Sequence, residues 1–170
     1  DRYVLEALEE LGYTYDSSVF PSRLVSAINF TNWILNRGRL QRAMGKSWKI
    51  GTAPKLPYHP DADYPWERGN LKLLEMPTTV LPVCQFPFIG TLLFLLGKSV
   101  FRSSYSWLRI FPRPLFYELH GIELVDYYTA VKDERLLVKP GLGLQVQQKV
   151  ELYSFMLGRF AKNYKFATMN

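Results

Sequence analysis

The residue best suited to chemistry in this sequence is His120, one of only two histidines in 170 residues. It lies in the largely apolar run 115–126, which we predict to be a buried strand that carries the histidine at its end. Gly121 follows directly and lets the backbone turn close to a ligand. A histidine so placed can transfer a proton near neutral pH. The alternative is a core histidine whose ring nitrogens are satisfied by neighbouring groups.

Two carboxylates in or at the end of predicted strands are the next candidates. Glu75 falls inside the apolar run 70–81, so it must be paired or face a polar cleft. Asp16 and the two serines after it, Ser17 and Ser18, end a strand predicted over 13–20. The alternative for these three residues is an ordinary cap or turn cluster. Glu75, Glu123 and Asp126 are all candidates for the carboxylate partner that a general-acid histidine needs.

A metal site is not indicated within this chain. His59, Asp61 and Asp63 are close in sequence, but no third and fourth ligand follows at a recognisable spacing. The single cysteine, Cys84, excludes an internal disulfide. The net charge of +6 is compatible with an anionic membrane surface or an acidic ligand, and no nucleic-acid-binding motif accompanies it.

The hydrophobic pattern predicts alternating helices and strands in one domain over residues 1–170, which is an α/β fold. The helices are expected at 2–11 (ended by Gly12), 22–44, 102–111 and 145–162, and the strands at 13–20, 70–81, 115–126 and 165–169. Residues 52–69 are expected to form a long loop, because they hold four prolines. In the last helix the expected buried side chains are Val146, Val150, Leu152, Phe155, Met156 and Phe160.

Two segments suggest contact with a membrane surface. The segment 22–49 is basic and amphipathic, with tryptophan and phenylalanine, as in interfacial helices, although an ordinary surface helix is the alternative. The segment 86–96 is apolar almost all round, so it is either deeply buried or exposed to a membrane or partner. With no signal peptide in the sequence, we expect a cytoplasmic or membrane-peripheral location.

Four stretches then occur in the order typical of one family: ELGYTYDSSVFP (10–21), LEMP (74–77), FYELHGIELVD (116–126), and a helix followed by YKFATM (164–169). Together they resemble the C-terminal half of polysaccharide deacetylases with a NodB-homology domain, the carbohydrate esterase family four and its relatives. The resemblance spans nearly the whole chain. It implies part of a distorted (β/α) barrel with its site at the carboxyl ends of the strands.

The resemblance also implies metal-dependent hydrolysis of an N-acetyl group on a polysaccharide or envelope glycan, a substrate that is lipid-linked in one version of the hypothesis. In this family a divalent metal, zinc or similar, is held by one aspartate and two histidines, and a late histidine protonates the leaving amine. His120 matches that late histidine. The substrate-binding residues that we predict are Asp16, Ser17, Ser18, Glu75 and Glu123.

The early motifs of the family, a TFDD run, an HxxxH pair and an Arg-x-Pro stretch, are missing from this sequence. We therefore expect the catalytic base and the metal ligands on a missing N-terminal half of the barrel, which becomes a required partner. The alternatives are a non-catalytic glycan- or membrane-surface-binding module, for which His120 is dispensable, and a deacetylase-like pseudoenzyme that binds glycan without a metal.

Half a barrel has unpaired edge strands and an uncovered inner face. We expect the purified 170-residue chain to aggregate, or to need its missing half. Size-exclusion chromatography together with a thermal melt checks this expectation. A monomer that unfolds in one sharp cooperative transition contradicts it.

Overall fold

The structure is a computed structural model that describes residues 2–27, 48–137, 139 and 141–168. The chain forms two compact units. We call residues 1–88 with 107–116 the strand unit, and residues 89–106 with 117–170 the helical unit. Each unit is described by itself below.

The strand unit begins with helix α1 (Arg2–Glu10), as predicted. Gly12 ends this helix in the left-handed conformation, at φ 81°. The N–H of Gly12 donates to the carbonyl of Glu9 (3.0 Å), and that of Tyr13 donates to the carbonyl of Leu8 (2.9 Å). These two bonds satisfy carbonyls that the helix end leaves open. The glycine signal in the sequence therefore located the end of the helix correctly.

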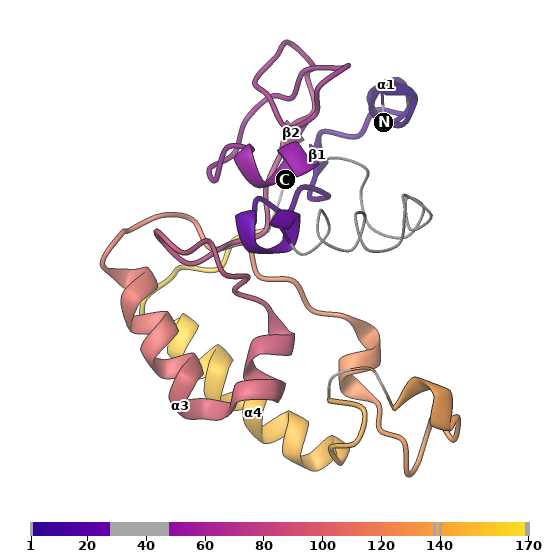
Figure 1. Ribbon diagram of the computed structural model, residues 1–170, viewed down its shortest axis with the longest axis vertical. Coiled ribbons are helices and arrows are strands. Elements are labelled where there is room, and N and C mark those ends of the chain that lie inside the picture. The colour runs from indigo at the N-terminus through magenta and orange to yellow at the C-terminus, as the bar shows by residue number, and fades with distance from the viewer. Residues whose placement is uncertain (1, 28–47, 138, 140, 169–170) are drawn as a thin grey trace. The chain divides into compact units, whose positions relative to one another are not determined.

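Strands β1 (Tyr15–Asp16) and β2 (Leu74–Glu75) pair in parallel and lie side by side (Figure 1). The N–H of Leu74 donates to Thr14 (2.9 Å), and the N–H of Met76 donates to Asp16 (2.8 Å). On its other side β2 forms an antiparallel bridge, in which Glu75 and Tyr58 exchange both backbone hydrogen bonds. β2 is thus the central segment, and both strands are shorter than the runs 13–20 and 70–81 predicted for them.

The core of the strand unit is made of buried aliphatic and aromatic side chains from segments far apart in the sequence. They include Leu5, Val19, Ala53, Tyr58, Leu73, Met76, Val80, Leu81, Phe88 and Leu108. The long loop predicted over 52–69 is confirmed, because this stretch contains only isolated bridges, at Tyr58 and between Pro60 and Arg68. A 3-10 turn, η1 (Trp48–Thr52), leads into it.

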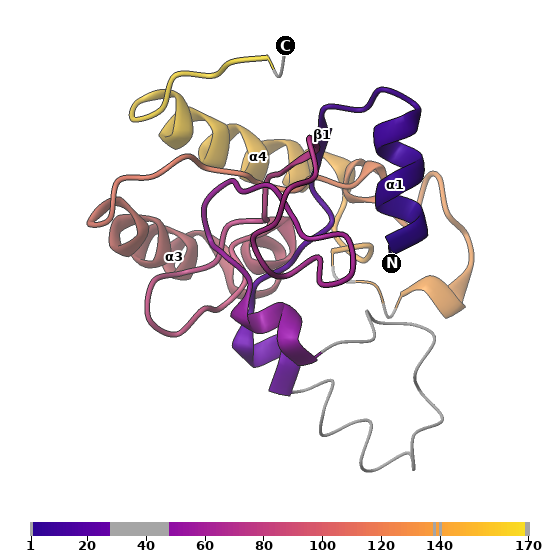
Figure 2. The same ribbon diagram turned by 90° about the horizontal axis from the view of Figure 1, so that it is seen from above.

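Helices α3 (Gly90–Arg109) and α4 (Val146–Ala161) lie next to each other in the helical unit (Figure 2). Phe101 of α3 packs on Phe155 and Phe160 of α4, with ring centroids 6.1 and 6.0 Å apart. The hydroxyl of Tyr105 donates to the carbonyl of Arg159 (3.0 Å). α3 kinks at Gly97, whose φ of 74° and ψ of −178° are not helical. The helix expected at 102–111 is therefore the second part of a longer, bent helix.

The helix predicted over 145–162 is confirmed as α4, and its buried face is the predicted one in part: Met156 and Phe160 are buried, and Val146, Leu152 and Phe155 are half-buried. The buried side chains are Lys149, Tyr153, Met156 and Phe160, whereas Val150 is exposed. Their spacing of four, three and four residues is a regular helical stripe. The prediction misses Lys149 and Tyr153 because it considers only aliphatic, methionine and phenylalanine side chains.

The prediction of a strand over 115–126 is wrong. Residues 112–120 are irregular and extended, and residues 121–124 form the 3-10 turn η2 (Gly121–Leu124). Pro112 and Pro114 have no N–H to donate. Phe116 accepts from the N–H of Thr79 (3.0 Å) but donates to that residue's side-chain hydroxyl (2.9 Å) rather than to a backbone carbonyl. No regular ladder forms, and His120 is exposed rather than buried.

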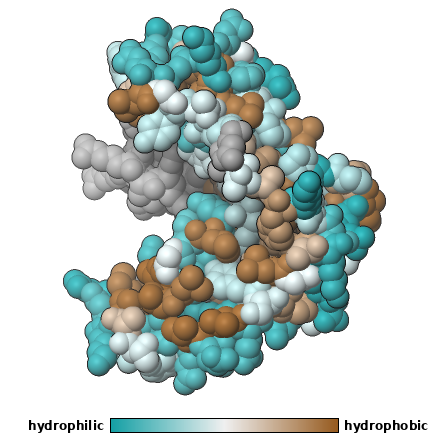
Figure 3. Space-filling view, turned by 180° about the vertical axis from the view of Figure 1, so that it is seen from behind, coloured by the Kyte–Doolittle hydropathy of each residue, from teal (hydrophilic) through white to brown (hydrophobic). Residues whose placement is uncertain are grey.

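Two other segments differ from expectation. Residues 165–168 form no strand, and Phe166 is exposed. The apolar run 86–96 is buried in one part and exposed in another. Phe88, Leu92 and Leu93 are buried, whereas Leu95 and Leu96 reach the surface. Other hydrophobic side chains also lie at the surface among polar ones (Figure 3).

The basic helix predicted over 22–44 falls mostly outside the described residues, which show only its start, helical at 23–27. A short 3-10 turn, η3 (Glu134–Leu136), precedes α4 in the chain. Within the described stretches, no helix is both long and apolar enough to span a bilayer. The half-barrel fold class and the single domain over residues 1–170 stay predictions.

We expect Gly12→Ala to lower the free energy of unfolding by about 1 kcal/mol, because an L side chain is strained at this positive φ. A Cβ at Gly12 meets nothing within 4 Å, so the cost is conformational rather than steric. Gly158→Ala is the matched control, since a Cβ there also meets nothing and the residue lies inside α4. It should stabilise by about 0.5–1 kcal/mol. Urea denaturation measures the change in the free energy of unfolding for each variant. Changes of the same sign would contradict this explanation.

Candidate functional site

The strand ends place Asp16, Ser17, Ser18 and Glu75 in one group, which we call the strand-end group. Asp16 and Glu75 are register partners in the parallel pair. The Asp16 carboxylate accepts from the N–H of Ser17 (2.9 Å) and from the hydroxyl of Ser18 (2.7 Å). The Ser17 hydroxyl donates to the carbonyl of Met76 (2.7 Å). The predicted place of Asp16, Ser17 and Ser18 at a strand end is confirmed, and their local bonds are those of a turn cluster. That Glu75 lies beside them was not predicted.

Glu75 is the buried member of the strand-end group, with a residue exposure of 1%. One carboxyl oxygen accepts from the N–H of Val19 (3.0 Å). Burial raises the pKa of Glu75 to about 7; the N–H groups of Val19 and Ser18 oppose this shift, and the negative charge of Asp16 adds to it. The two neighbouring carboxyl groups thus differ in environment, one buried and one partly exposed. Such a pair can hold a proton on Glu75 near neutral pH.

The helical unit contains the second group, around His120. The His120 Nε2 atom lies 3.7 Å from a carboxyl oxygen of Glu118, and both side chains are about half exposed. Sequence reasoning missed Glu118 and named Glu75, Glu123 and Asp126 instead. The signal was available, because residues two apart in an extended segment point to the same side. An exposed ion pair contributes little to stability, so the interest of this pair is chemical.

Glu123 contacts the backbone of His120 and not its ring. Its buried carboxylate accepts from the N–H of His120 (3.1 Å) and from the hydroxyl of Tyr153. A Cβ at Gly90 would lie 2.8 Å from both carboxyl oxygens, so the carboxylate sits against the first residue of α3. Negative charge is favourable at a helix N-terminus. The geometry gives Glu123 a positioning role toward the His120 turn, and its predicted role in substrate binding stays a prediction.

Asp126 and Lys149 are two further buried polar residues of the helical unit. Asp126 accepts from the hydroxyl and the N–H of Thr129 (both 2.7 Å) and from the N–H of Val146 at the start of α4 (2.9 Å). These bonds, that of the Thr129 hydroxyl above all, hold the pKa of Asp126 below its usual range. The Lys149 ammonium donates to the carbonyl of Val125. Asp126 is therefore committed to the helix start rather than to His120.

The residues of the long loop are also bonded locally. The Nδ1 atom of His59 lies 3.1 Å from the carbonyl oxygen of Leu73, and Asp61 accepts from the N–H groups of Asp63 and Tyr64 (both 2.9 Å). In the part of the chain that the structure describes, no group of three or more His, Cys, Asp or Glu side chains is arranged to hold a metal ion. The divalent metal implied by the resemblance, with ligands outside this sequence, stays a prediction.

We expect the free energy of unfolding to fall as pH rises from 5 to 8. Folded Glu75 keeps its proton to about pH 7, whereas the unfolded residue loses it near pH 4.5. In this window the folded state binds more protons, so raising the pH favours unfolding, by on the order of 2–3 kcal/mol. Urea denaturation of wild type and Glu75→Gln at each pH measures the difference between them.

The difference between wild type and Glu75→Gln isolates this residue from every other titrating group in the chain. Glu118→Gln serves as the exposed control and should change stability by less than about 0.5 kcal/mol at every pH. The pKa assigned to Glu75 is contradicted if wild type and Glu75→Gln differ in free energy of unfolding by the same amount at every pH from 5 to 8.

No family model, no curated protein and no solved structure matches the chain. A function must therefore be argued from the two groups of side chains, the strand-end group and the group around His120. One is a carboxyl pair with two serines at the ends of parallel strands, and the other is an exposed histidine with a carboxylate beside it and a second carboxylate beneath its backbone.

Proposed function

We propose that the chain is the C-terminal part of a metal-dependent N-deacetylase that acts on an N-acetylated polysaccharide or envelope glycan. The observation that carries the proposal is the parallel pairing of β1 with β2, which gathers the strand-end group. In folds built on parallel strands, ligands bind at the carboxyl ends of those strands. The LGYTYDSS motif from which the resemblance was drawn supplies one of these two strand ends.

The strand-end group suits a sugar. Ser17 and Ser18 are exposed, and Asp16 is partly exposed, so hydroxyl and carboxylate oxygens are available to solvent at one place. A carboxylate that accepts from sugar hydroxyls forms charge-assisted hydrogen bonds, which are stronger than neutral ones. In this proposal Asp16, with Ser17 and Ser18, binds the glycan. Glu75 lies beneath them and tunes the charge of the group through its own protonation.

His120 is the proposed general acid. As the C–N bond of the acetamide breaks, the imidazolium donates its proton to the departing amine nitrogen, and the neutral imidazole remains. Glu118, at 3.7 Å, stabilises the charged ring before the transfer. Glu123 holds the backbone of this turn through the His120 N–H. The catalytic base and the metal ligands lie, in this proposal, on residues outside this sequence.

The second candidate is a non-catalytic module that binds a glycan or a membrane surface. The observation that favours it is that no group of metal-ligating side chains lies among the described residues. The two candidates make opposite statements about His120, which is essential for the first and replaceable for the second.

The test begins with mass spectrometry of the natural protein, to find whether upstream residues carry the Asp and the HxxxH pair. In that intact protein we expect His120→Ala to lower the rate of acetate release by about 10²–10⁴-fold, the usual contribution of a general acid. His59→Ala is the matched control and should leave the rate nearly unchanged, because His59 bonds to the carbonyl of Leu73. Equal rates for wild type and His120→Ala would overturn the proposed role.

A further inference from the structure

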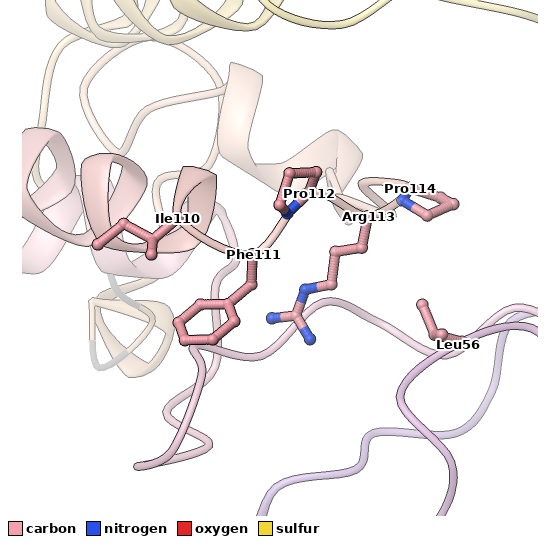
Figure 4. Close-up of a pocket in the computed structure, with 6 residues that line it drawn as sticks. All are labelled: Leu56, Ile110, Phe111, Pro112, Arg113 and Pro114. Carbon is pink, nitrogen blue, oxygen red and sulfur yellow. The ribbon is translucent and has the colours of Figure 1, made fainter.

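The strand unit has an open groove of about 510 Å³, lined by Leu56 and by the run Ile110, Phe111, Pro112, Arg113 and Pro114 (Figure 4). Its walls are mostly apolar. Ile110 is 68% exposed, Phe111 49% and Leu56 47%, so large hydrophobic side chains are presented to solvent at one place. Exposed apolar patches of this kind mark interaction sites. The groove is the apolar half of a surface that we call the docking face.

Cations form the other half of the docking face. In Figure 4 the Arg113 guanidinium lies between Phe111 and Leu56. It donates to the carbonyl of Val80, which fixes it at the groove. Lys55 adjoins Leu56, and its ammonium donates to the carbonyl of Ala53 (3.2 Å).

Arg23 lies close to the start of the long loop that contains Lys55, because a Cβ added at Gly51 would lie 3.1 Å from the Cα atom of Arg23. Burial lowers the pKa of Lys55, and the positive charges of Arg23 and Arg113 lower it further. Both of these positive charges therefore repel Lys55, and an anion bound beside Lys55 would reduce that repulsion. The charge pattern of the docking face therefore complements a negatively charged partner.

A hairpin tip in the strand unit adds a further apolar side chain. Val83 is 85% exposed and has a φ of 62°, a conformation that is costly for a β-branched residue. Two carbonyls of this hairpin connect it to the cations, one at its base and one near its tip. Val80 accepts from Arg113, and Gln85 accepts from Ser22, the neighbour of Arg23 (2.7 Å). The exposed Cys84 lies at the same tip.

We propose that the docking face binds the surface of an anionic lipid bilayer. Arg113, Lys55 and Arg23 meet the lipid phosphates, while the exposed hydrophobic side chains enter the boundary between head groups and acyl chains. A soluble anion would satisfy the cations and leave the apolar side chains in water, so a bilayer accounts for both halves. Arg23 belongs to the basic segment 22–49, whereas Lys55, Arg113 and the apolar side chains of the docking face do not. The inference gives a surface to the membrane-binding candidate and does not depend on the deacetylase function.

The test is flotation of the full chain with vesicles on a density gradient, in which vesicle-bound protein rises and aggregated protein sediments. One set contains equal parts of phosphatidylglycerol and phosphatidylcholine, and the other contains phosphatidylcholine alone. We expect binding to the anionic vesicles only, and we expect added salt to weaken it, because salt screens charges at the surface. Arg23→Gln and Lys55→Gln should each reduce the partition coefficient about fivefold. Phe111→Ser should reduce it roughly tenfold.

Two matched substitutions in the helical unit serve as controls. Lys132→Gln removes an exposed cation, and Phe166→Ser removes an exposed phenylalanine, and neither should change binding. Equal binding to the two vesicle types, or equal losses in the controls and in the docking-face variants, overturns the proposal. Release of the protein by millimolar inorganic phosphate at constant ionic strength also overturns it, because the site would then take a free anion. The salt dependence of wild type tests the proposal without any variant.

Discussion

The burial of the Glu75 carboxyl group is the constraint on which the strand unit depends. Its backbone pairs with Tyr58 on one side, while the residues before and after it pair with β1 on the other. Its side chain then has to accept from Val19, which holds the chain as it leaves β1. A buried carboxyl without such a partner would cost several kcal/mol. Both strands and the turn that follows Asp16 are therefore arranged around the carboxyl group of Glu75.

Much of the local structure could be predicted from the sequence, because its signals are local. Gly12 ends α1 where a left-handed residue is needed, and the periodicity of 145–162 predicts α4. The prediction for 115–126 failed because apolar, aromatic residues favour a strand only when a neighbour supplies a full ladder. Pro112 and Pro114 remove donors just before it, and Thr79 offers its hydroxyl in place of its carbonyl.

The candidate site, too, could be predicted from the sequence only in part. The cluster at Asp16 and the need of Glu75 for a partner could each be predicted, because polar residues in apolar strands must be bonded or face a polar cleft. The pairing of Asp16 with Glu75 could not, because it depends on how the two strands meet. Glu118 was overlooked although residues 118 and 120 share a side of any extended segment, because an exposed carboxylate was not expected in a strand predicted to be buried. The bonds of Glu123 to Tyr153 and of Asp126 to Val146 join residues 30 and 20 apart in sequence, and only the fold brings such residues together.

The hairpin tip has a chemical consequence of its own. Cys84 is the only cysteine in the sequence, and it is exposed between two residues of positive φ, Val83 and Gln85. In air, two chains can join through one disulfide and no more, so oxidation produces covalent pairs and never longer chains. The same thiol accepts a single maleimide dye without any substitution. The molecule thus carries a built-in attachment point for a fluorescent reporter beside Val83.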